Sequence, residues 1–130
     1  MSAALIARYY AAFNAGDWDA MVACLSDDVA HDINQGGRQT GKAEFRIFLA
    51  HMERCYKERL DDIVIMANGD RAAAEFTVHG EYLNTDEGLP PATGQRYTLP
   101  AGAFFEIADA LIRRVTVYYN LPDWTRQVAP

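Results

Sequence analysis

The spacing of hydrophobic residues changes once along this chain, and that change constrains the fold more than any other feature. Up to about residue 58, apolar residues recur mostly at helical spacing, with one short strand pattern at 29–34. From about residue 59 they alternate with polar residues, and Asn68-Gly69-Asp70 indicates a tight hairpin. Helices followed by an antiparallel meander predict an α+β fold with the helices packed on one side of the sheet.

Three helices are expected in the first half. Ser2 can cap the first, Gly16 can end it, and its buried face carries Leu5, Tyr9, Ala12 and Phe13. Asp17 can cap a short second helix with the stripe Trp18, Met21, Val22 and Leu25. After a loop at 35–41, Thr40 or Gly41 opens a third helix, whose apolar stripe is Phe45, Phe48, Leu49, Met52 and Tyr56. His51 falls off this stripe and is expected to be solvated.

The second half predicts four strands. In the strand that begins at Arg71, Phe76, Val78, Gly80 and Tyr82 share one face, and Glu75, Thr77, His79 and Glu81 share the other. The polar loop at 84–94 is long enough to cover a site or an interface. A second hairpin joins 95–107 to 111–120, and Trp124 anchors the tail. A sheet wrapped around helices leaves a conical interior with a pocket at its wide end.

Composition limits the possible partners. The 130 residues suit one domain, residues 1–130, and the net charge of −6 opposes nucleic-acid binding. No apolar run approaches the ~20 residues of a membrane span, and no secretory signal is present, so a cytoplasmic protein is expected. Cys24 and Cys55 are expected to be free thiols. Three separated histidines, with neither cysteine near one, indicate no metal site.

Several motifs resemble one known group. Residues 8–17 (RYYAAFNAGD), 27–32 (DDVAHD) and 102–106 (GAFFE) resemble ketosteroid isomerases and SnoaL-like proteins of the nuclear transport factor 2-like superfamily. Residues 31–37 (HDINQGG), 94–97 (GQRY) and 99–102 (LPAG) look like an isomerase-related branch of that group. The resemblance implies a cone that holds an apolar ligand between helices and a curved sheet. It also implies that Tyr9 matches the donor tyrosine, whereas Ile33 and Gly102 replace the base and the second donor.

Four residues are candidates for catalysis. His31 shares a strand face with Val29 and Ile33, so it is either a base, acid or oxyanion donor, or a satisfied core histidine. Asp32 points away unless a bulge turns it toward His31. Glu75 belongs to the outer sheet face and a dimer interface, or is a base if the two faces are inverted. Tyr9 is a donor or a core aromatic. Glu58 is expected to pair with an arginine in a structural role.

The sequence thus predicts a cofactor-independent acid–base enzyme that acts on a small apolar carbonyl compound through an enolate, by isomerisation, cyclisation or dehydration. It is not expected to be a standard ketosteroid isomerase. The alternative is a non-catalytic ligand-binding or dimerisation module of the same fold. A homodimer through the outer sheet face is expected. The predicted pocket wall comprises Phe45, Met52, Tyr56, Phe76, Val78, Gly102, Phe104, Tyr119 and Trp124.

Overall fold

The computed structural model describes residues 2–34 and 36–130, and the predicted loop residue Gln35 lies outside these ranges. Within them the elements are, in chain order, α1 (Ser2–Ala15), α2 (Trp18–Ala23), β1 (Leu25–Ile33), β2 (Arg38–Thr40), α3 (Lys42–Cys55), β3 (Tyr56–Asn68), β4 (Arg71–Tyr82), β5 (Arg96–Ala108), β6 (Leu111–Tyr119) and α4 (Leu121–Val128). No helix in the described part of the chain is long and apolar enough to cross a membrane.

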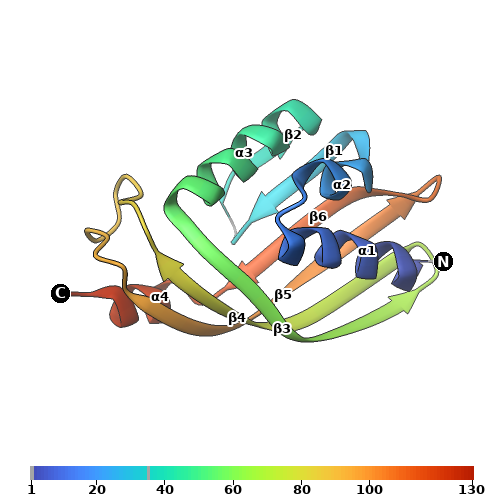
Figure 1. Ribbon diagram of the computed structural model, residues 1–130. Coiled ribbons are helices and arrows are strands. Elements are labelled where there is room, and N and C mark those ends of the chain that lie inside the picture. The colour runs from blue at the N-terminus through green and yellow to red at the C-terminus, as the bar shows by residue number, and fades with distance from the viewer. Residues whose placement is uncertain (1, 35) are drawn as a thin grey trace.

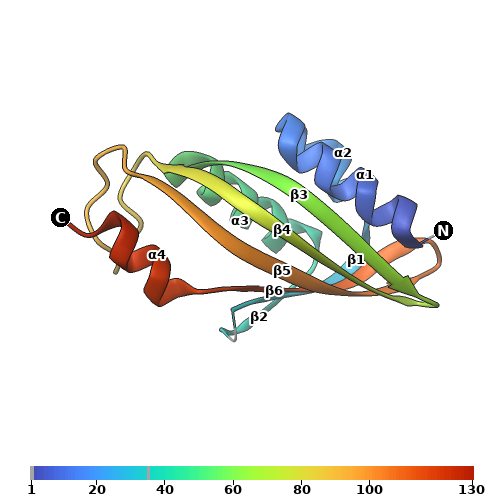
Figure 2. The ribbon, with the colours of Figure 1, turned by 90° about the horizontal axis from the view of Figure 1, so that it is seen from below.

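The described strands form one curved, unclosed sheet in the order β2-β1-β6-β5-β4-β3. Strands β3 to β6 are the predicted antiparallel meander, whereas β1 joins β6 in parallel, with Ile33 opposite Val117. Helices α1, α2 and α3 gather on one side of the sheet (Figure 1). Helix α4 lies at the far end, beside the loop that follows β4 (Figure 2). The α+β prediction is confirmed.

The first two helices follow the predicted pattern. Helix α1 ends before Gly16, whose φ of +69° is accessible to glycine without a Cβ penalty. Asp17 caps α2, because its Oδ1 accepts a hydrogen bond from the backbone N–H of Ala20 at 3.1 Å. Ser2 differs from its predicted role: it lies inside α1, and its hydroxyl donates to the carbonyl of Gly69 at 2.9 Å. It therefore ties the start of α1 to the β3–β4 turn.

Three element boundaries differ from the sequence prediction. Strand β1 begins at Leu25 rather than Val29, and the short strand β2 lies within the expected loop. Helix α3 ends at Cys55, so Tyr56 opens β3 instead of completing the helical stripe. The backbone of Tyr56 is extended (φ −135°, ψ 148°) and pairs with Tyr82. No glycine or proline separates α3 from β3, which is why helical spacing alone could not locate this boundary.

A β-bulge divides strand β3 into two halves with opposite parity. The register with β4 shifts between Asp61 and Val64, and Asp62 has a φ of +55°. Before the bulge, Leu60 lies opposite the buried Val78; after it, Val64 lies opposite the exposed Glu75. Even-numbered residues of β3 therefore face the helices before the bulge and face away from them after it.

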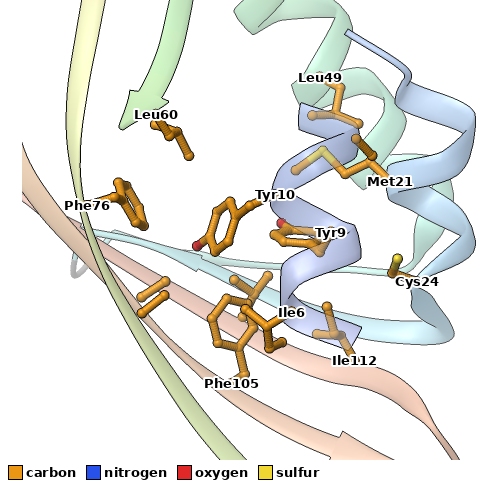
Figure 3. Packing of buried hydrophobic residues seen from close by; sticks show 14 of the residues in the cluster. Ile6, Tyr9, Tyr10, Met21, Cys24, Leu49, Leu60, Phe76, Phe105 and Ile112 are labelled. Atoms are coloured by element: carbon orange, nitrogen blue, oxygen red, sulfur yellow. The ribbon is translucent and has the colours of Figure 1, made fainter. Parts of the chain in front are cut away.

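The inner face of the sheet and the helices enclose the core. On β4, Phe76 and Val78 are buried and Glu75 is exposed, as the alternation predicts. On β5, Phe105 is 1% exposed whereas Phe104 is 52% exposed. Tyr9 and Tyr10 project from α1 toward Phe76 and Phe105 (Figure 3). Trp124 is buried as the predicted anchor, on a helix that Asn120 caps.

Candidate functional site

One cavity of about 400 Å³ lies between α1, α2, α3 and the inner face of the sheet. Ligand pockets in proteins commonly measure about 300–1,000 Å³ and combine an apolar wall with a few polar groups. Most of this wall is aromatic or aliphatic. Its polar groups lie in three places: Tyr9 and His31, then Glu58, and then Asp86 with its neighbours.

Tyr9 contributes a hydroxyl to the helical side of the cavity. The side chain is 3% exposed, and its ring packs edge-on against Tyr10 and Phe105 at centroid distances of 5.1 and 5.9 Å. Figure 3 shows both tyrosines pointing from α1 toward the sheet. Burial raises the pKa of Tyr9, with smaller raising contributions from Tyr10 and Cys24. The phenol is therefore a neutral hydrogen-bond donor.

His31 lies on β1 in an aromatic part of the wall. Its ring centroid is 4.6 Å from that of Phe45 and 4.6 Å from that of Phe48. Its Nδ1 atom is enclosed without a hydrogen-bond partner among the described residues. Burial lowers the pKa of His31 to about 4, against a raising contribution from Asp32. At neutral pH the imidazole is uncharged, so it is a weak base but a competent donor.

Asp32 points away from the cavity, as the alternation along β1 predicts, so the conditional acid–base pair with His31 does not form. No bulge turns its side chain inward; it accepts hydrogen bonds from Arg38 at 2.8 and 3.0 Å and from Thr116 at 2.9 Å. The hydrogen bonds from Arg38 are the largest contribution lowering the pKa of Asp32, and the one from Thr116 adds to them against partial burial. Asp32 is an ion-pair partner on the outer face.

Glu58 is the carboxylate that does line the cavity. Its Oε2 accepts a hydrogen bond from the hydroxyl of Tyr97, and the partly buried side chain lines the cavity. Burial raises the pKa of Glu58, while the hydrogen bond from Tyr97 lowers it in part. The expected pairing with an arginine is wrong: Arg59 points to the other face and pairs with Asp61 at 2.7 Å.

The loop at 84–94 closes one side of the cavity, as its length predicts. Asp86 accepts a hydrogen bond from the Tyr56 hydroxyl at 2.6 Å, and its Oδ1 lies 3.0 Å from His51 Nε2. Arg54 contacts His51 Nδ1 at 3.1 Å. A guanidinium can only donate, so His51 Nδ1 accepts and Nε2 carries the proton. His51 is thus partly buried and bonded, not solvated.

Asp86 stays ionised within this cluster. Partial burial raises its pKa, but the hydrogen bonds from Tyr56 and His51 outweigh that effect, so the pKa of Asp86 is lowered. The atoms of His51, Cys55 and Asp86 that could bind a metal ion lie within 4.8 Å of one another. The prediction that neither cysteine lies near a histidine is therefore wrong. A metal ion bound there would have to replace the contact between His51 and Asp86.

Most of the predicted wall residues do line the cavity: Phe45, Met52, Tyr56, Phe76, Val78, Tyr119 and Trp124. Gly102 and Phe104 do not, and neither does Glu75. All three belong to the outer face, where Gly102 pairs with Glu75 and Phe104 packs on Tyr118. The parity of β5 was misassigned at the Phe104-Phe105 pair, because a slip of one residue exchanges the two faces of a strand.

Glu58 is the main residue that the sequence analysis missed. Alternation extrapolated back from Ile63 and Ile65 puts an even-numbered residue such as Glu58 on the outer face. The bulge at Asp62 reverses that parity. The sequence does contain a signal for Glu58: Tyr56, Glu58 and Leu60 share one face, and Tyr56 and Leu60 are large apolar side chains. That face would be expected to point inward.

Comparison with known proteins identifies relatives along nearly the whole chain. The SnoaL-like domain family matches residues 6–115. A structure from Pseudomonas putida, assigned provisionally as a polyketide cyclase, is 64% identical, with a TM-score of 0.98 over 99% of this chain and 98% of that chain. A similarly assigned structure from Silicibacter sp. is 60% identical, with a TM-score of 0.95 over 97% and 93% of the two chains.

More distant structures share only the fold. An epoxide hydrolase from M. tuberculosis is 18% identical, with a TM-score of 0.74 over 97% of this chain and 87% of that chain. A nuclear transport factor 2-like protein from Burkholderia pseudomallei is also 18% identical, with a TM-score of 0.83 over 97% and 95%. Among curated proteins, none matches this chain.

Proposed function

This chain belongs to the SnoaL-like domain family, and on that basis we propose that it is a cofactor-independent acid–base enzyme acting on a small, largely apolar carbonyl compound through an enolate. Relatives 57–64% identical carry a provisional polyketide cyclase assignment, which favours cyclisation over isomerisation or dehydration. Because the fold hosts many chemistries, the proposal rests on the cavity and not on the fold.

The observation that carries the proposal is the neutral His31 imidazole in an aromatic wall of the cavity that Tyr9 also lines. Enolate formation places negative charge on the former carbonyl oxygen. Neutral donors fixed in an apolar, water-poor site stabilise such a charge strongly, because the low local dielectric does not screen it. His31 and Tyr9 are assigned this donor role. Phe45, Phe48 and Phe76 supply the dry wall around them.

Binding of phenols tests this role, because a planar phenol imitates an enolate. A series of para-substituted phenols of increasing acidity is titrated into the wild type, Tyr9→Phe and His31→Phe, and affinity is measured by calorimetry. We expect affinity to rise with acidity in the wild type and to fall about tenfold in each variant, since one buried hydrogen bond contributes about 1.4 kcal/mol. Tyr118→Phe, which removes a hydroxyl from the outer face, is the control. Equal affinity in all four proteins would refute the assignment.

A non-catalytic ligand-binding module is the second candidate. The observation that favours it is Ile33, an apolar residue that lines the cavity where the resemblance to ketosteroid isomerases implies a base. A binding module would retain phenols without exchanging any carbon-bound proton of a ketone. The two candidates therefore differ in turnover and not in affinity.

Self-association through the outer sheet face completes the proposal. Val64, Met66, Phe104 and Tyr118 are 40–52% exposed on this face, and Phe104 and Tyr118 contact each other. Ion pairs of Arg38 with Asp32 and of Arg114 with Glu106 lie on the same face. Exposed apolar side chains interspersed with charged pairs are compatible with a protein interface, and a second copy of this chain is the proposed partner.

A further inference from the structure

Three residues in one row across the sheet build a second polar site in the cavity wall. Glu58 on β3 lies opposite Gly80 on β4, and Gly80 lies opposite Tyr97 on β5. A Cβ atom at Gly80 would lie 2.1 Å from Cζ and 2.4 Å from the hydroxyl oxygen of Tyr97. The phenol ring therefore lies over the bare backbone of Gly80, and its hydroxyl reaches across to Glu58 Oε2.

The surroundings of Glu58 contain hydrogen-bond donors and aromatic rings but no cation. No lysine or arginine among the described residues pairs with it, and its pKa responds only to burial and to Tyr97. Burial raises the pKa of Tyr119 on β6, and the charges of Glu58 and of Asp86 in the covering loop raise it further, so Tyr119 lies within electrostatic reach of both carboxylates. Tyr56 and Trp124 add aromatic walls near Tyr97.

An enclosed carboxylate without a cation costs stability, because it loses its hydration and gains only one hydrogen bond in return. A structural role does not account for it, since an apolar residue would fill the wall at lower cost. Enclosed carboxylates with perturbed titration in a cavity are typical of proton-transfer sites. The hydrogen bond from Tyr97 engages Oε2, and Oε1 accepts no hydrogen bond from the described residues.

We propose that Glu58 is the catalytic base of this cavity, that Tyr97 positions it, and that the substrate is an uncharged carbonyl compound without a carboxylate. The proposal rests on the proposed enolate chemistry and assigns the base that Ile33 cannot supply. The requirement for an uncharged substrate follows from charge: Glu58 borders the cavity without a cation and His31 is neutral, while Arg54 offsets part of the charge of Asp86. A ligand carboxylate would meet repulsion at low dielectric.

In the proposed step, Glu58 takes a proton from the carbon next to the carbonyl. The electron pair of that C–H bond forms a C=C bond, and the carbonyl π pair moves to oxygen as the enolate. In isomerisation, the protonated Glu58 returns its proton to a different carbon. In cyclisation, the enolate carbon attacks a second carbonyl of the same molecule, and the resulting alkoxide takes the proton from Glu58. Either route restores the carboxylate and needs no further reactant.

Deuterium exchange provides the test, with 2-tetralone as the probe ketone. Its incorporation of deuterium next to the carbonyl in D₂O is followed by NMR for the wild type, Glu58→Gln and the control Glu75→Gln. Glu75 lies exposed on the outer face, so the control removes a carboxylate outside the cavity. Affinity for 2-naphthol and the melting temperature are measured for the same proteins.

A positioned base contributes about 10²–10⁴-fold to rate, so Glu58→Gln should lose at least 100-fold of the exchange above background. Its 2-naphthol affinity should stay close to the wild type, its melting temperature should not fall below the wild type, and Glu75→Gln should exchange normally. Wild-type exchange that persists in Glu58→Gln would overturn the role of Glu58 and leave the enolate proposal standing. Naphthol binding without wild-type exchange would overturn both the base and the catalytic function. If the wild type neither binds 2-naphthol nor exchanges, the proposed oxyanion site is refuted as well.

Tyr97→Phe separates positioning from mere packing. Loss of its hydrogen bond should raise the pKa of Glu58, so the pH at which exchange reaches half its maximum should move upward. A lower rate with an unmoved midpoint would contradict the positioning role.

The substrate charge is tested with 6-hydroxy-2-naphthoate, which adds a carboxylate to 2-naphthol. We expect at least tenfold weaker binding than 2-naphthol at pH 8, and a smaller difference in Glu58→Gln. Equal affinities of the two compounds in the wild type would contradict the requirement for an uncharged substrate.

Discussion

Tyr97 occupies the space that the absent side chain of Gly80 leaves on the neighbouring strand. A methyl group at Gly80 would lie 2.1 Å from Cζ of Tyr97, closer than any non-bonded contact allows. The ring reaches Glu58 only because position 80 has no Cβ. Gly80, in the middle of β4, therefore determines whether the carboxylate of Glu58 has a hydrogen-bond donor.

Gly80→Ala should destabilise the protein by about 1–3 kcal/mol, because the ring of Tyr97 has to leave its position and strain follows. In the double variant Gly80→Ala/Tyr97→Val, the smaller side chain removes the clash. The free energy of unfolding, measured by urea denaturation, should then fall by less than the sum of the two single losses. Additive losses would show that the two positions do not interact.

Glu58→Gln should stabilise the protein at pH 8 by about 1–3 kcal/mol, since it removes an enclosed charge without a cation. The pKa of Glu58 is raised above its ordinary value of 4.5 on folding, so the folded state binds more protons than the unfolded chain just above pH 4.5. Wild-type stability therefore falls as pH rises through that interval. The advantage of the variant should disappear at pH 4. A variant less stable than the wild type at pH 8 would contradict this account.

His31 should make stability depend on pH in the opposite direction. Its pKa falls from 6.5 to about 4 on folding, so the unfolded chain binds more protons between these values. The stabilisation of the folded state by neutral His31 is complete above pH 6.5 and is lost as pH falls to about 4. It amounts to about 3 kcal/mol. The difference in unfolding free energy between the wild type and His31→Leu should follow this interval. A difference between the two proteins that does not change between pH 4 and pH 6.5 would contradict this account.

Asn14→Ala should cost about 1–2 kcal/mol, because it removes two hydrogen bonds that join α1 to β3. Asn14 Nδ2 donates to the carbonyl of Leu60 and its Oδ1 accepts from the N–H of Leu60, both at 2.9 Å. These bonds hold the strand just before the bulge. Thermal denaturation measures the loss, with Asn68→Ala at the exposed end of β3 as the control. An equal effect of the two substitutions would argue against this anchor.

Phe104→Glu and Met66→Glu should convert the proposed dimer to monomer. Each places a charge among the exposed apolar side chains of the outer face, where association would bury it without a partner. Sedimentation velocity over a range of concentrations should show at least a tenfold weaker association. Ile47→Glu, on a side chain of α3 that is 64% exposed, is the control. A wild-type protein that is monomeric at all concentrations would refute the interface.

The sequence predicts the α1 helix and its end correctly, because the causes are local. The helical spacing of Leu5, Tyr9 and Ala12 and the left-handed turn at Gly16 depend only on neighbouring residues. The same holds for the turn at Gly69 and for the alternation of Phe76 and Val78, which fixes the inner face of β4. The helical spacing also placed Tyr9 on the buried face of α1, and the face that His31 shares with Val29 and Ile33 placed His31 inward; both residues line the cavity.

The sequence alone therefore determined the α+β class, the order of the first three helices, β1 and the four-stranded meander, and the residues that β4 buries, since each follows from periodicity within a few residues. Only the tertiary structure decided which carboxylate enters the cavity. The bulge at Asp62 reverses the parity of β3 and turns Glu58 inward, whereas Asp32 is held outside by Arg38 and Thr116. Tyr97 reaches Glu58 across Gly80 because three strands distant in sequence align in register. Alternation cannot foresee a bulge, and the bulge at Asp62 shifts the β3–β4 register that the turn at Gly69 would otherwise set.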